Sequence, residues 1–103
     1  MKKQVAVASS AALDKAAQLI RSGQLVPAEQ VLREVLKKAP ANAEAMRLLG
    51  DVYYSREDYK KAFEIFQRSL SLRISYETLM ALTATAEMLR LLDIAEKNYR
   101  LMI

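Results

Sequence analysis

Residues 43–75, AEAMRLLGDVYYSREDYKKAFEIFQRSLSLRIS, decide the fold. Their apolar residues recur at three- and four-residue spacing in two runs, one from about Asn42 to Ser55 and the other from Tyr59 onward. This spacing is typical of amphipathic helices. Asp58 stands just before the second run, where its carboxylate can accept hydrogen bonds from the free N–H groups of a helix start. The stretch therefore predicts two helices joined by a short turn.

The same pattern recurs along the chain. Five positions of the preceding stretch, Leu25, Ala28, Leu32, Val35 and Pro40, return 34 residues later as Tyr59, Ala62, Phe66, Ser69 and Ile74. A weaker third unit follows at a spacing of 33, with Leu82, Ala86, Ala95 and Tyr99 in the places of Leu49, Tyr53, Ala62 and Phe66. A fixed period of this length indicates stacked helical hairpins.

Helix boundaries in the first unit follow from its Ser, Gly and Pro residues. We expect a helix from Ser9 or Ser10, because a serine hydroxyl caps a helix start, to Gly23, because glycine adopts the left-handed conformation that closes a helix. The next helix is expected from about Val26–Pro27, since proline is tolerated in a first turn. Residues 1–8 are expected to form a flexible leader ahead of a repeat domain at 9–103.

Gly50 is the unusual residue of the central unit. Glycine inside a helix costs about 1 kcal/mol relative to alanine, so we expect a neighbouring helix to approach closely there. In the third unit Thr83 takes the place of Gly50, and the turn at residues 90–93 has no glycine. Asp93 is the expected cap of the last helix.

The recurring residues resemble those of the tetratricopeptide repeat: Leu49, Gly50, Tyr53, Tyr59, Ala62 and Phe66, and, one unit earlier, Gly23, Ala28, Leu32, Pro40 and Asn42. The resemblance implies an all-α, right-handed solenoid of three antiparallel helix–turn–helix repeats with six helices. The repeats would cover about 9–42, 43–75 and 76–103. It also implies a binding scaffold, in which the first helices of successive units line a concave groove that receives a peptide or a helix.

The resemblance places a set of residues along that groove: Leu13, Ala17, Ile20, Arg21, Arg47, Asp51, Tyr54, Met80, Ala84, Glu87 and Met88. Most are apolar and a few are charged, which favours a partly hydrophobic segment or an amphipathic helix as the ligand. Two alternatives stay open. Leu13, Ile20 and Met80 can instead be core residues, and Arg47 and Asp51 can form a surface pair of negligible energetic value.

Composition argues against several other functions. The chain has 103 residues with no Cys and no His, so disulfides, imidazole catalysis and the common zinc sites are excluded. It has no glycine-rich phosphate loop, and we expect no enzymatic activity, cofactor or metal site. The net charge is +4, but acidic residues accompany the basic ones. Nucleic acid is therefore not the expected partner, and RNA binding would need basic and aromatic residues along one groove.

The sequence thus predicts a protein-interaction module: an adaptor, an assembly factor or a chaperone. The alternative is a repeat segment of a larger multidomain protein or enzyme, which recruits substrate or mediates self-association through its apolar C-terminal end. That end contains Tyr99, Leu101, Met102 and Ile103. The apolar run near the N-terminus is too short for a signal peptide, and no stretch is long enough to span a membrane, so a cytoplasmic location is favoured.

Overall fold

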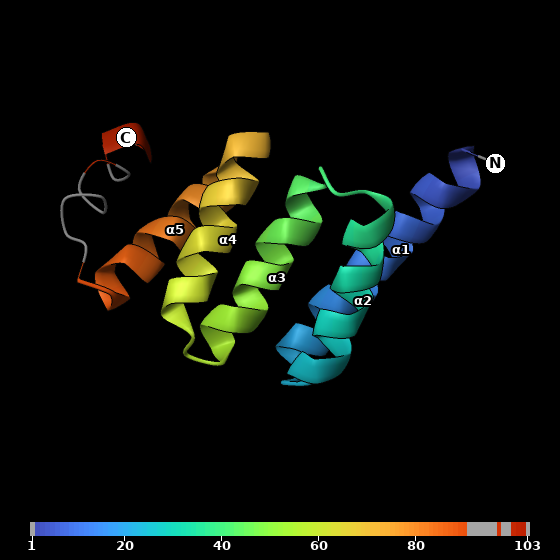
Figure 1. The fold of residues 1–103 in the computed structure, drawn as a ribbon, viewed down its shortest axis with the longest axis horizontal. Helices are drawn as coiled ribbons and strands as arrows, with labels where there is room; N and C mark the ends of the chain where they lie inside the picture. The colour runs from blue at the N-terminus through green and yellow to red at the C-terminus, as the bar shows by residue number, and fades with distance from the viewer. Residues whose placement is uncertain (1, 91–96, 98–99, 103) are drawn as a thin grey trace.

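The computed structural model describes residues 2–90, 97 and 100–102, and all regular structure within them is helical (Figure 1). The helices are α1 (Lys2–Arg21), α2 (Leu25–Lys38), α3 (Ala43–Ser55), α4 (Tyr59–Leu72) and α5 (Tyr76–Met88). Residues 97 and 100–102 are also helical. The predicted all-α class is confirmed. Most of the predicted last helix, including its expected cap Asp93, lies outside the described residues.

Helix α1 is longer than the sequence pattern suggested. It begins at Lys2, so the predicted start at Ser9 or Ser10 is wrong. Residues 2–12 contain neither Gly nor Pro and four alanines. Alanine is the strongest helix former, and nothing in this stretch forces a break, so the two serines lie inside the helix. The division between a leader at 1–8 and a repeat domain at 9–103 stays a prediction.

Side-chain caps mark the starts of α3, α4 and α5. The Asn42 Oδ1 accepts from the Ala45 N–H at 2.9 Å, and the Asp58 Oδ1 accepts from the Lys61 N–H at 3.3 Å, as predicted for Asp58. The Ser75 Oγ accepts from the Thr78 N–H at 3.1 Å. Each cap satisfies a backbone donor that the helix itself leaves without a partner, so these starts are specified locally.

One residue after each of α1, α3 and α5 has a left-handed backbone. Gly23, Glu57 and Arg90 have φ values of 79°, 64° and 62°, and they are separated by the same 34 and 33 residues as the repeats. The residue after the first two of them, Gln24 or Asp58, donates its N–H to a carbonyl five residues earlier. This arrangement closes the C-terminus of a helix. Arg90 therefore has the left-handed φ of Gly23 although it, like Glu57, is not a glycine.

The helices pack in two layers. In the first two hairpins the helices pack against each other, α1 against α2 and α3 against α4, and α3 also packs against α2 of the preceding unit. Helix α1 contacts α3, and α3 contacts α5, whereas α2 and α4 make no contact with each other. Successive helices are therefore closer together on the side of α1, α3 and α5 than on the side of α2 and α4. We call the first side the inner face and the second the outer face. The right-handed sense of the solenoid stays a prediction.

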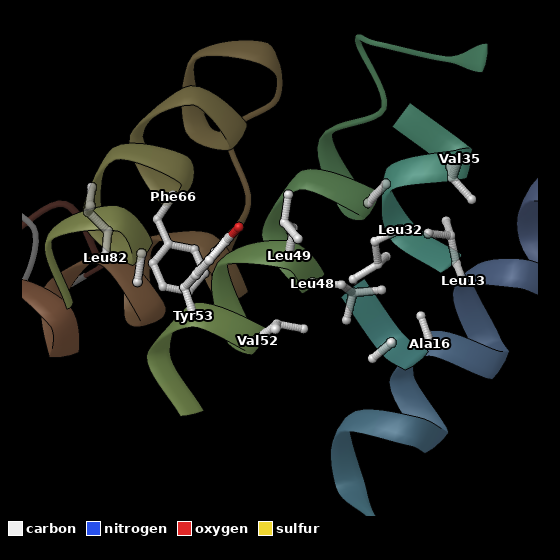
Figure 2. Packing of buried hydrophobic residues seen from close by; sticks show 13 residues of the cluster. Leu13, Ala16, Leu32, Val35, Leu48, Leu49, Val52, Tyr53, Phe66 and Leu82 are labelled. Atoms are coloured by element: carbon white, nitrogen blue, oxygen red, sulfur yellow. The ribbon is translucent and has the colours of Figure 1, made fainter. Parts of the chain in front are cut away.

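One hydrophobic core runs through the stack. Figure 2 shows Leu13, Leu32 and Leu48 meeting where α1, α2 and α3 pack, and Tyr53 and Phe66 close together farther along the stack. Ala62 is completely buried, as its place in the repeat predicted. The Ser69 hydroxyl, also buried, donates to the Ala43 carbonyl at 2.8 Å and joins the end of α4 to the start of α3. The core thus fixes how successive hairpins are placed.

Candidate functional site: the inner face

A polar network between α2 and α3 fixes the orientation of α3. Glu29 of α2 accepts from the Tyr53 hydroxyl at 2.8 Å, from Arg33 at 2.7 Å and from Arg56 at 2.7 Å. Burial acts to raise the pKa of Glu29, but the hydrogen bonds from Tyr53, Arg33 and Arg56 outweigh it and lower the pKa to about 2. The network joins two consecutive hairpins, and it thereby sets which edge of α3 is turned to the inner face.

The predicted site residues of α1 differ in accessibility. Leu13 is 7% exposed and belongs to the core. Ala17 and Ile20 are half-buried and pack against the core, and only Arg21 is exposed. The alternative interpretation of Leu13 as a core residue is therefore the one that matches its burial, and α1 offers a partner little apolar surface at this position.

Arg47 and Asp51 face each other on α3. The Arg47 Nη1 lies 3.4 Å from the Asp51 Oδ2, and the two side chains are 24% and 33% exposed. Burial raises the pKa of Asp51 to about 6, although the positive charge of Arg47 acts to lower it. The pair is thus more buried than an ordinary surface ion pair, and Arg47 compensates the carboxylate incompletely.

Tyr54 follows Asp51 by three residues on α3, about one helical turn later. Its ring is half-buried, packs against the core and makes an edge-to-face contact with Tyr59, with centroids 5.2 Å apart and planes at 70°. Edge-to-face contacts of this kind stabilise aromatic pairs. The ring is therefore held in place by its own chain and presents only part of its surface.

Helix α5 carries exposed large apolar side chains, which α3 and the part of α1 whose burial is described do not. Met80 and Met88 are each 50% exposed, Ala84 is half-buried, and Glu87 is exposed. Tyr76, at 59% exposure, extends this set, and the sequence prediction missed it. Its position four residues before Met80 was the available signal. For Met80 the structure thus favours a surface role over the core interpretation.

Two pockets flank α5. A polar one of about 190 Å³ lies between the starts of α3 and α5 and the end of α4, and its lining includes Arg47, Arg73, Glu44 and Glu77. An apolar one of about 490 Å³ is lined by residues that include Leu70, Ile74, Leu79, Leu82 and Leu101. The first holds both signs of charge, and the second is suited to aliphatic groups.

The part of the chain that the structure describes contains neither a metal-binding cluster of side chains nor a membrane-spanning helix. No group of three or more Asp or Glu side chains is arranged to hold a metal ion. No helix in this part of the chain combines the length and the apolar character needed to cross a bilayer.

Stacked antiparallel hairpins with a common turn, a common core register and an accessible layer of first helices define a helical repeat protein. Residues 13–77 match the family model of the tetratricopeptide repeat, and the chain belongs to this family. Comparison with curated proteins gave no match. Tetratricopeptide repeats generally mediate protein–protein interaction and are typically non-catalytic.

Proposed function

We propose that this chain is a non-catalytic interaction module, acting as an adaptor, assembly factor or chaperone, which holds a partly hydrophobic peptide or helix against its inner face. The observation that carries the proposal is the exposed apolar edge of α5, where Met80 and Met88 are half exposed on a helix that contacts α3, the helix of the charged pair. Methionine side chains are flexible and polarisable, so such an edge accommodates partners of different shapes.

Loss of partner binding in inner-face variants tests this proposal. The double variant Tyr54→Ala with Met80→Ser changes the inner edges of α3 and α5, while Arg68→Glu changes an exposed position of α4 on the outer side. Proteins captured from the native host by the wild-type chain should be lost with the first variant and retained with the second. Circular dichroism should give the same helicity for all three chains. Unchanged capture by the double variant would contradict the proposal.

Self-association is a second candidate, favoured by the apolar pocket of about 490 Å³ and by Ile74, which is 79% exposed at its rim. Two copies would bury this surface against each other, since exposed apolar patches commonly mark interaction sites. Sedimentation velocity at increasing concentration tests it. A dimer that Ile74→Glu converts to monomer supports this candidate, and a monomer at all concentrations removes it.

A further inference from the structure

Helix α5 is apolar on two sides, and only one of them faces the core. Leu79, Leu82 and Ala86 are buried. Tyr76, Met80, Ala84 and Met88 follow one another at four-residue spacing, and Tyr76, Met80 and Met88 are at least half exposed. Residues at this spacing form a ridge of the kind that packs into the groove of another helix. The ridge is about 18 Å long at 1.5 Å per residue, which matches about three turns of a partner helix.

Asp51 supplies a specific polar contact point on the neighbouring helix. Its side chain is two-thirds buried, and the 3.4 Å contact with Arg47 is the one ion pair that it makes within the described residues. A carboxylate can accept about four hydrogen bonds, so most of its capacity is left over. The raised pKa of Asp51, about 6, agrees with this incomplete compensation. A lysine or arginine from a partner would supply the missing donor and the missing charge.

The distribution of charge among the helices also favours a basic partner. Helices α3 and α5 together contain four acidic residues and one basic residue, a net charge of −3. Helices α2 and α4 contain three acidic and six basic residues, a net charge of +3. Helix α1 contains one acidic and four basic residues and is also basic. The chain is basic as a whole, so the acidic character is concentrated where the apolar ridge is exposed.

We infer that α3 and α5 bind a basic amphipathic helix of a partner protein, whose apolar side chains pack on Tyr76, Met80 and Met88 and whose cationic side chain binds Asp51. The inference rests on the proposed function and specifies the class of partner. Apolar contact supplies the contact area, and the charges select the partner and its orientation.

Two synthetic helical peptides of 18 residues provide the probe. Both carry the same leucines and alanines on one face, and the other face carries lysine in one peptide and glutamate in the other. Fluorescence anisotropy with the full chain should give binding of the lysine peptide at least about tenfold tighter than that of the glutamate peptide. Asp51→Asn should weaken the lysine peptide about tenfold and leave the glutamate peptide unchanged or tighter. Glu34→Gln, on the outer side of α2, is the matched control and should change neither.

Met80→Ser separates the inference from the function on which it rests. Equal binding of both peptides, weakened by Met80→Ser, would support inner-face binding but overturn the preference for a basic partner. Binding of the lysine peptide that neither Asp51→Asn nor Met80→Ser weakens would overturn the inferred site. Failure of the lysine peptide to bind would also overturn the inference, whereas the proposed function would still be decided by the capture experiment with host proteins.

Discussion

Gly50 of α3 lies against the ring of Phe66 of α4, so closely that a Cβ built on Gly50 would be 2.6 Å from Cδ1 and 2.9 Å from Cζ of that ring. Phe66 is buried, and the ring has little room to move away. The close approach predicted from a glycine inside a helix is confirmed. The missing side chain is what allows the two helices of the central hairpin to pack at this distance.

Gly50→Ala is expected to destabilise the protein by about 1 to 3 kcal/mol. In an isolated helix the change would gain about 1 kcal/mol, but inserting a methyl group into a filled core forces the Phe66 ring or the backbone to shift. Urea unfolding followed by circular dichroism measures the difference. Combining Gly50→Ala with Phe66→Leu should recover part of the loss, because the smaller side chain leaves space for the methyl group. A more stable single variant would mean that the contact is not tight.

Replacing the turn residue Glu57 by glycine should stabilise the folded protein. Its φ of 64° is in the left-handed region, which costs a residue with a side chain about 1 kcal/mol and costs glycine little. We expect Glu57→Gly to stabilise the protein by about 0.5 kcal/mol, since glycine also adds entropy to the unfolded chain. Thermal or urea unfolding measures it, and Glu57→Ala controls for the loss of charge.

Gly23→Ala is the reverse experiment at the equivalent turn. No side chain or backbone atom lies within 4 Å of a Cβ built there, so the added methyl group meets no steric obstacle. The expected loss of about 1 kcal/mol therefore reports the left-handed backbone alone, at φ 79°. If both exchanges changed stability in the same direction, the shared turn conformation would not be the cause.

The repeat was predictable from sequence because stacking makes steric demands at fixed positions. Gly50 and Ala62 must be small for helices to approach, and this requirement can be recognised from residue type and spacing alone. The start of α1 was not predictable from sequence. A run of helix-forming residues does not show where a helix begins when serines are tolerated inside it. The Glu29 network was also beyond the sequence, because Tyr53 and Arg56 reach Glu29 only after two hairpins have stacked.

The binding site was less predictable than the fold for a physical reason. Leu13 and Met80 occupy equivalent places in their helices, and both are apolar at helical spacing. Leu13 is buried in the core cluster, whereas Met80 is half exposed. Periodicity gives the direction of a side chain relative to its own helix, but exposure depends on what the rest of the stack places opposite it.

Acid should weaken the Glu29 network. The folded-state pKa of Glu29 is about 2, below its ordinary value of 4.5, so its contribution is complete above pH 4.5 and is lost as the pH falls toward 2. We expect the loss to be about 2 kcal/mol, allowing for solvent screening at the exposed side of the network. Unfolding measured between pH 5 and 2.5 should give a shallower decline for Glu29→Gln than for wild type. Parallel declines would mean that this carboxylate does not take part in acid unfolding.

Asp51 should have the opposite effect in a separate pH range. Its folded-state pKa of about 6 lies above the ordinary 3.8, so the folded protein binds this proton more tightly than the unfolded chain does. Stability from this group is therefore greatest below pH 4 and declines as the pH rises through 6. Asp51→Asn should flatten that decline and make the protein more stable at pH 7, while Asp14→Asn, at an exposed position of α1, should not.

Carboxyl NMR titration of Asp51 measures the midpoint directly, and a midpoint near 4 would contradict the expected stabilisation. The comparison also bears on function, because Asp51→Asn is expected both to stabilise the unbound protein and to weaken the lysine peptide. A residue that serves packing alone would not give this pair of effects, since its replacement would lower the stability of the unbound protein. An aspartate that costs stability at neutral pH and gains affinity for a cation is instead what a binding site requires.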